Sequence, residues 1–240
     1  MAKTTGLGDD LYVGGYHIGG DIQQLGVKGG PALLDVTDIT QSAHSRLGGL
    51  RDGSLDITSY HDPAAGQSHA AFSGLPRTDV IMAYLRGQAI GNPSACLNAK
   101  QVNYDPTRAA DGSLLFKVTG DGDSYGLEWG LQLTAGLRTD TTATNGTSLD
   151  NGAGTANGAQ AYLQAVSLTG STVTITVQHS TDNATWTTLV AFTAYTSAPA
   201  AQRVTASGTV NRYLRVISAG TFTSTAFQVT LVRNATAVVF

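Results

Sequence analysis

The chain of 240 residues is poor in cysteine, charge and glutamate. Its one cysteine, Cys96, excludes an internal disulfide framework and a zinc site built from several thiolates. Charged residues make up 13%, about half of the roughly 25% that is usual for soluble domains. A net charge of −3 excludes a generic basic nucleic-acid binder, which needs a surplus of lysine and arginine. No apolar run approaches the ~20 residues that span a bilayer, and no signal peptide is expected, so synthesis in a cytoplasm is predicted.

Motifs that carry catalysis are also missing. The sequence has no GxSxG nucleophile elbow, no GxxxxGK[ST] phosphate loop and no HExxH zinc motif. Its only glutamate is Glu128, although pairs of aspartates leave a glycosidase open. The sequence therefore predicts a protein that is not an enzyme and has neither a cofactor nor a metal site.

What the sequence does contain is strand-forming, threonine- and glycine-rich segments. Residues 171–179, STVTITVQH, alternate between apolar and polar residues, as expected for a half-buried antiparallel strand. In residues 211–216, Leu214 and Val216 are expected on one face, with Tyr213 and Arg215 on the other. Further strands are predicted at 11–18, 32–39, 54–60, 79–86, 96–104, 113–119, 126–134, 159–168, 186–195, 202–206, 210–217 and 225–233.

Two segments break the strand pattern. Residues 63–75 follow Asp62, begin with proline and end at Gly74 before Pro76, which predicts one short helix held to a sheet by Ala71, Phe72 and Leu75. Residues 40–52 have no sustained periodicity, so we predict an extended loop or arm that orders on a neighbour.

Composition divides the chain in two. Residues 1–150 hold 10 basic and 16 acidic residues, a net of −6, whereas residues 151–240 hold four arginines and one aspartate, a net of +3. Between them lies a polar, glycine-rich stretch that cannot bury apolar surface. We therefore predict a mainly β protein with a β-sandwich or barrel domain at 1–140, a linker or exposed loop at 141–158, and an Ig-like or jelly-roll-like sandwich at 159–240.

Several strings together resemble the major tail tube proteins of long-tailed phages, most closely those that infect actinobacteria. They are LYVGGYHIGGDI (11–22), PALLDVTDITQSAHSRLGGLRDGSLDITSYHDP (31–63), LPRTD (75–79), GNPSACLNAKQVNYDPTRAADGSLLFKV (91–118), YGLEWGLQL (125–133) and NRYLRVISAGTF (211–222).

This resemblance implies a virion protein whose copies form rings, usually of six subunits, that stack into a tube. The tube would enclose a tape-measure protein, contact tail terminator and baseplate proteins, and conduct DNA without binding it specifically. A ring of three, with both domains lining the bore, stays open. The resemblance also implies that the predicted arm reaches the next ring, with His44, Arg46, Leu47, Leu50 and Arg51 as candidate contacts, and that the C-terminal domain decorates the outside.

Net negative charge in the first domain predicts an acidic or neutral bore, because a basic wall would hold phosphates. Candidates for the wall are Asp35, Asp38, Asp56 and Asp62, for which ordinary solvated surface is an equal alternative.

Three other functions stay open. A carbohydrate-binding module would use exposed aromatic side chains, for which the candidates are Trp186, Tyr195 and Tyr213, although a single sandwich tryptophan is more often in the core. A capsid or neck decoration protein would belong to the same structural class. A hydrolase on a β scaffold lacks a recognisable catalytic constellation.

Overall fold

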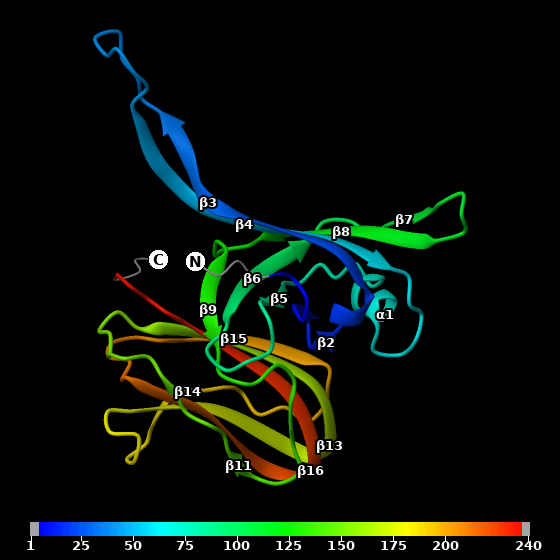
Figure 1. The fold of residues 1–240 in the computed structure, drawn as a ribbon, viewed down its shortest axis with the longest axis vertical. Helices are drawn as coiled ribbons and strands as arrows, with labels where there is room; N and C mark the ends of the chain where they lie inside the picture. Colours follow the sequence, from blue (N-terminus) through cyan, green and yellow to red (C-terminus); the bar gives the residue numbers. More distant parts are fainter. Residues whose placement is uncertain (1–4, 237–240) are drawn as a thin grey trace.

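A computed structural model describes residues 5–236 and confirms the mainly β fold class. All the strand pairings are antiparallel, and they join sixteen strands into one continuous sheet that folds over itself (Figure 1). The first nine strands form what we call the N-terminal half, and the other seven form the C-terminal half. Besides a single-turn 3-10 helix, Gly19–Asp21, the described residues contain one α-helix, α1 (Ser68–Phe72).

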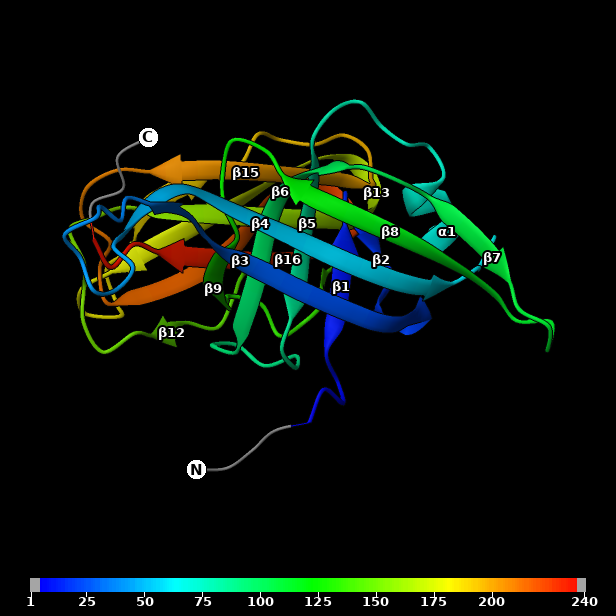
Figure 2. The same ribbon diagram turned by 90° about the horizontal axis from the view of Figure 1, so that it is seen from above.

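The N-terminal half is a sandwich of two layers. One layer holds β1 (Asp10–Val13), β2 (Tyr16–His17), β5 (Val80–Leu85), β6 (Pro93–Gln101) and β9 (Glu128–Gln132). The other holds β3 (Ile22–Asp35), β4 (Arg46–Tyr60), β8 (Leu114–Gly122) and β7 (Asp105–Arg108), in that order across the sheet (Figure 2). The core between the layers includes Leu11, Val13, Leu55, Ile57, Phe72, Met82, Leu97, Phe116 and Val118.

The C-terminal half is built around two long strands, β13 (Ala159–Ser180) and β16 (Tyr213–Arg233), which pair along almost their whole length. Each was predicted as two separate strands, and that prediction is wrong. At the first expected break the register shifts on either side of Gly170, which marks β-bulges, whereas the pairing stays in register at the second, Gly220. The φ angles of these two glycines, 150° and 136°, are ones that favour glycine. The bulges let one strand bend from one layer into the other instead of ending.

Shorter strands complete the C-terminal half. They are β10 (Arg138–Asp140), β11 (Thr144–Asn145), β12 (Leu149–Asp150), β14 (Thr187–Ala191) and β15 (Ala200–Ala206). Leu214 and Val216 are buried whereas Tyr213 and Arg215 are half-buried, so the predicted alternation along β16 is confirmed.

The predicted linker at 141–158 contains β11 and β12, and both pair with β16. Arg212 adds a bidentate ion pair to Asp150, at 2.6 and 2.7 Å. In addition, β16 pairs with β9, which joins the two halves into the one sheet. The segment is therefore held along the C-terminal half, and the division into domains at 1–140 and 159–240 stays a prediction.

The junction between the halves is a third buried cluster, which includes Tyr12, Leu85, Cys96, Tyr162 and Val232. Burial raises the pKa of the Cys96 thiol to about 12. Since the thiolate is the reactive form, we expect Cys96 to resist a maleimide or disulfide reagent in the folded protein and to react fully in denaturant. Rapid labelling of the folded protein, measured by mass spectrometry, would contradict this packing.

The predicted short helix is confirmed, but three details predicted for the N-terminal half are wrong: the single strand at 11–18, the length of the helix and the burial of Leu75. The strand predicted at 11–18 is a hairpin of β1 and β2, because Gly14 and Gly15 have positive φ and form a turn. The helix predicted at 63–75 covers only Ser68–Phe72, because Gly66 has a φ of 84° and the preceding residues form a turn. Phe72 and Ala71 do pack on the core as expected, whereas Leu75 is half-exposed.

Candidate self-assembly surface

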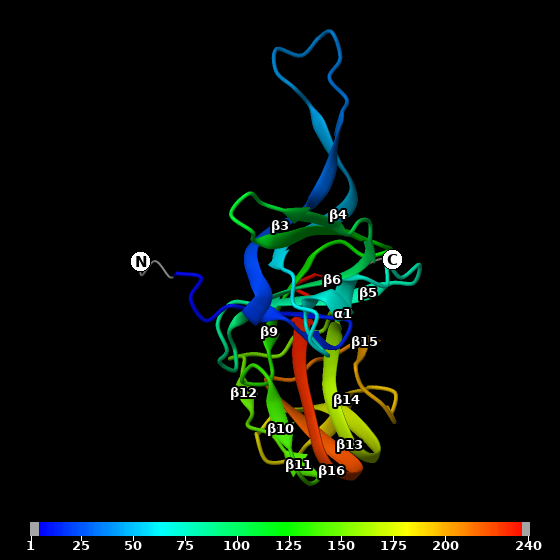
Figure 3. The same ribbon diagram turned by 90° about the vertical axis from the view of Figure 1, so that its right-hand side faces the viewer.

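Among residues 5–236, exposed large apolar side chains are most concentrated on a hairpin made by the far ends of β3 and β4. We call residues 30–52 the arm, and residues 29 and 51–53, which pack on residues 126–128, its root. Beyond this root the arm stands clear of both halves (Figures 1 and 3). The prediction of an irregular segment at 40–52 is wrong for residues 46–52, which form the first half of β4. The strand predicted at 32–39 also ends earlier, at Asp35, where the tip begins.

Apolar side chains are concentrated on the arm. Of the twelve exposed large hydrophobic side chains among residues 5–236, the arm carries six: Leu33, Leu34, Val36, Ile39, Leu47 and Leu50. Leu34 and Leu47 are directly opposite each other across the hairpin, and Leu50 is 87% exposed. Scattered exposed leucines are ordinary, but a concentration of large apolar side chains on a projecting element is typical of an interaction site.

Local hydrogen bonds give the tip of the arm a defined shape. The Asp35 carboxylate accepts from the Thr37 backbone N–H at 2.9 Å and lies 3.0 Å from Nδ1 of His44. Asp38 accepts from the backbone N–H of Thr40 at 2.8 Å. Hydrogen bonds from the Thr37 and Thr40 side chains lower the pKa values of these two carboxyl groups. Asp35 and Asp38, two of the four aspartates predicted for the bore wall, thus lie at the tip of the arm.

The other predicted wall residues lie elsewhere. Asp56 is in the middle of β4, on the side facing away from the core, where Nζ of Lys28 is 2.5 Å away. Lys28 lowers the pKa of the Asp56 carboxyl group. Asp62 follows β4 and accepts a hydrogen bond from the backbone N–H of Ala64, 2.8 Å away. The four aspartates are therefore spread from the tip of the arm to the far end of β4.

Asp56 belongs to a polar sheet face that sequence reasoning missed. It comprises polar outward side chains of β3, β4 and β8, among them two lysines and two aspartates. Asp52 lies at the next outward position of β4 towards the arm, so the face has no net positive charge. Its members are Gln24, Lys28, Ser54, Asp56, Thr58, Lys117, Thr119 and Asp121. Alternation along β4 was a signal for three of them, Ser54, Asp56 and Thr58, whereas the partners on β3 and β8 required the register of the sheet.

The aromatic residues proposed for a sugar platform do not form one. Tyr195 is buried, with 6% exposure, and its hydroxyl is 2.7 Å from that of Thr225, so its predicted exposure is wrong. The guanidinium group of Arg215 lies 4.2 Å from the ring centroid of Trp186. Arg212 similarly covers Tyr213 at 4.9 Å. One face of each partly exposed ring is thus occupied by an arginine, which a stacking sugar would have to displace.

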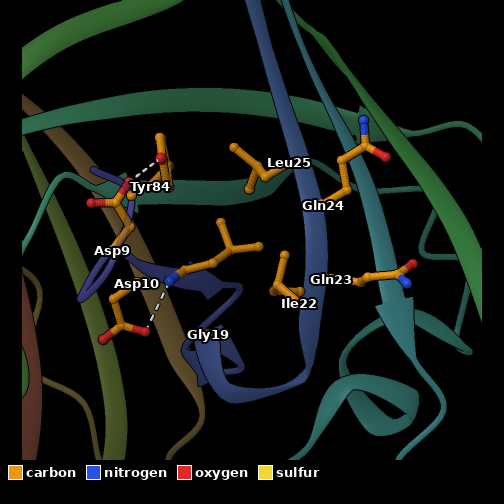
Figure 4. Close-up of a pocket in the computed structure, with 10 residues that line it drawn as sticks. Asp9, Asp10, Gly19, Ile22, Gln23, Gln24, Leu25 and Tyr84 are labelled. Atoms are coloured by element: carbon orange, nitrogen blue, oxygen red, sulfur yellow. Dashed lines mark hydrogen bonds between the residues drawn. The ribbon is translucent and has the colours of Figure 1, made fainter. Parts of the chain in front are cut away.

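A cavity of about 290 Å³ lies beside β3 and is lined by Asp9, Asp10 and Tyr84 among others (Figure 4). Asp10 accepts hydrogen bonds from the Leu11 backbone N–H, 2.9 Å away, and from Nε2 of His17, 2.8 Å away. The Tyr84 hydroxyl donates to Asp9, and burial raises the pKa of Tyr84 to about 12. Both carboxylates are already engaged within the fold, so the cavity offers no free acid–base pair.

Neither a metal site nor a membrane helix emerges from residues 5–236. No group of three or more histidine, cysteine, aspartate or glutamate side chains in that range could hold a metal ion. No helix in that range has the length and hydropathy that crossing a bilayer requires.

Comparison with known proteins gives only distant similarities. No family model and no curated protein matches the sequence. A chain from the virion of a native gene transfer agent particle aligns over 53% of this chain and 98% of its own length, with 10% identity and a TM-score of 0.44. The SPP1 Dit protein, described as a paradigm of the hub adsorption apparatus in phages infecting Gram-positive bacteria, covers 94% of this chain and 99% of its own, with 10% identity and a TM-score of 0.32. A chain of the activated phage p2 baseplate covers 96% and 99%, with 9% identity and a TM-score of 0.33. At these identities and scores the similarities establish no shared function.

Proposed function

We propose that the chain is a structural phage virion protein, without enzymatic activity, whose copies assemble into stacked rings that form the tail tube. The observation that carries the proposal is the arm, whose six large apolar side chains are 45–104% exposed. Burying a large aliphatic side chain contributes about 1.5–3 kcal/mol, so covering the arm with a second copy gives a strong drive to associate. The arm projects beyond the body, which suits a contact with the next ring.

The free edges of the second sheet layer suit pairing within a ring. In the described residues β3 pairs only with β4 and β7 pairs only with β8, so the layer has a free edge on each side. An unpaired edge exposes backbone N–H and C=O groups that another strand can satisfy. Pairing the β3 edge of one copy with the β7 edge of the next is a head-to-tail contact, which closes into a ring with cyclic symmetry. Six copies in a ring is the number that the family resemblance implies.

The outward polar face of β3, β4 and β8 is the proposed wall of the bore. Two aspartates match its two lysines, Asp52 adds a further carboxylate beside them, and Lys28 is already paired with Asp56. A wall without net positive charge lets DNA pass without holding its phosphates. Of the four aspartates predicted for the wall, only Asp56 is part of this proposal. The tape-measure protein would occupy the bore before DNA passes, tail terminator and baseplate proteins would contact the ends, and synthesis would take place in the host cytoplasm.

Electron microscopy of the purified full chain tests the proposal. We expect hollow, striated tubes in negative stain at high protein concentration, with the arm at the contact between striations. Monodisperse single copies at every concentration would overturn it. Closed shells or isolated plates would instead favour the capsid or neck decoration alternative.

Chemical cross-linking tests the head-to-tail arrangement. One variant would carry Gln24→Cys on β3 and another Thr107→Cys on β7, both at exposed positions, with buried Cys96 as the unreactive background. A short bis-maleimide should give covalent dimers when the variants are mixed and few when either is treated alone. Efficient dimer formation by either variant alone would show that like edges meet, and would contradict the ring.

A further inference from the structure

The chain's only glutamate is buried where the arm meets the two halves. Glu128 begins β9 and is 5% exposed. Arg203 of β15 donates to its carboxylate from Nε and Nη2, with distances of 3.1–3.3 Å. The Tyr162 hydroxyl, on β13, also donates to Glu128. One carboxylate therefore binds two strands of the C-terminal half.

The same carboxylate faces the root of the arm. Nη2 of Arg51, on β4, lies 4.0 Å from Oε1 of Glu128. Arg51 is half-exposed, so this ion pair alone contributes little, at most about 1 kcal/mol. The ion pair matters for geometry, because it connects a side chain of the arm to the carboxylate that also binds the C-terminal half.

The backbone of the arm root packs on the segment just before Glu128. A Cβ atom added to Gly53 would lie 2.6 Å from the backbone nitrogen of Leu127, and one added to Gly29 would lie 2.8 Å from the Leu127 side chain. A Cβ atom on Gly126 would lie 2.9 Å from that of Arg51. Three glycines thus permit an approach that any side chain would obstruct, and both strands of the arm rest on residues 126–127.

Arg203 completes the connection from the other side. Its guanidinium group lies 3.5 Å from the ring centroid of Tyr125, at the start of the segment that supports the arm. Its side chain is only 7% exposed, where cation–π and ionic contacts are least screened by water. Residues 125–128 are therefore bound to the arm on one side and to the C-terminal half on the other.

We propose that Glu128 is a positioning residue that, through Arg51 and Arg203, sets the angle at which the arm leaves the body relative to the C-terminal half. A buried ion pair adds little net stability compared with apolar side chains of similar volume, but its geometry is demanding. An arm that must meet a neighbouring copy gains from a fixed angle, because less conformational freedom is lost on association. The inference concerns the single chain and holds whether or not the chain forms a tube.

Distances between two spin labels, measured by double electron–electron resonance, test this inference. The labels would be placed at Arg46→Cys on the arm and Thr188→Cys on β14, both exposed, while Cys96 stays unlabelled. The full-length labelled protein would be diluted into unlabelled protein, so that each particle contributes one pair whether or not it assembles. We expect one narrow distance distribution, which broadens and shifts in Glu128→Gln and broadens in Arg51→Ala.

The matched control is Lys28→Ala, which removes another basic side chain near the arm root but faces Asp56 on the outer side of the sheet. It should leave the distribution unchanged. If Glu128→Gln fails to fold, the Arg51→Ala variant alone tests the proposal, because the half-exposed Arg51 side chain can be removed without disturbing the core. A distribution in Arg51→Ala as narrow as that of the parent would overturn the proposal, whatever the outcome of microscopy on the tubes.

Discussion

Replacing Leu47 and Leu50 together by serine is expected to raise the protein concentration needed for tube assembly by roughly 30- to 1,000-fold. Both side chains project from the arm, 57% and 87% exposed. Full burial of two leucines would contribute about 3–6 kcal/mol. Because part of the Leu47 surface is already covered in the single chain, we expect the loss of the two contacts to weaken association by roughly 2–4 kcal/mol per copy. The measurement is the amount of sedimentable protein as a function of total concentration.

The control for this pair is Leu47→Met with Leu50→Met, which keeps the apolar surface and nearly the same volume. We expect this variant to assemble within a few-fold of the parent. The serine variant should unfold at the parent's denaturant concentration, because exposed positions away from special features change stability by only about 0.5 kcal/mol. Unaltered assembly of the folded serine variant would show that the arm is not the contact, and the proposed function would lose its main support.

The parts of the fold that could be predicted are those in which local pattern and tertiary environment agree. Residues 54–60 alternate, and the structure buries Leu55, Ile57 and Ser59 on one side. The same holds for Leu214 and Val216. In such strands one face meets a core and the other meets solvent, so the sequence records the burial directly.

The arm was harder to predict because glycines interrupt its pattern. Gly29, Gly48, Gly49 and Gly53 lower the strand propensity that the local sequence shows. Two of them, Gly29 and Gly53, are required by the approach of Leu127, which lies 98 and 74 residues further along the chain. Leu47 and Leu50 lie on a projecting arm, and their role as contacts stays a prediction, whereas the strand pairing of residues 46–52 with residues 30–35 was not predicted.

The Glu128 junction could not be predicted because its members are far apart in sequence. Arg203 is 75 residues from Glu128, and Tyr162 is 34. The sequence offered a single signal, a lone glutamate within an apolar strand pattern, which indicates a buried acid that needs a partner. Which arginine meets it depends on the long pairing of β13 with β15 and β16.

Removing Arg203 is expected to destabilise the fold by roughly 3–5 kcal/mol, because it leaves the buried Glu128 carboxylate without its main counter-charge. The change is Arg203→Ala, and the measurement is the free energy of unfolding in urea. Pairing Glu128→Gln with Arg203→Met should recover most of that loss, because both charges leave the interior while the volume is nearly kept.

The matched comparison is Arg212→Ala, which breaks the bidentate pair with Asp150 at the surface, where both side chains are 44% exposed. Solvent screens that pair, so we expect the free energy of unfolding to fall no more than it does for an ordinary surface substitution. If Arg203→Ala and Arg212→Ala lower the free energy of unfolding by the same small amount, the Glu128 carboxylate is more accessible to water than its burial indicates and is not held by Arg203. A different outcome is a large loss of stability in Arg203→Ala, and recovered stability but a broader distribution of distances between arm and C-terminal half in the Glu128→Gln, Arg203→Met variant. That outcome would show that the stability of the fold and the positioning of the arm are separable. The separation is expected because a buried charge cluster contributes little net stability compared with apolar side chains of similar volume. Apolar replacements can therefore restore the stability of the fold without restoring the geometry that the charges impose.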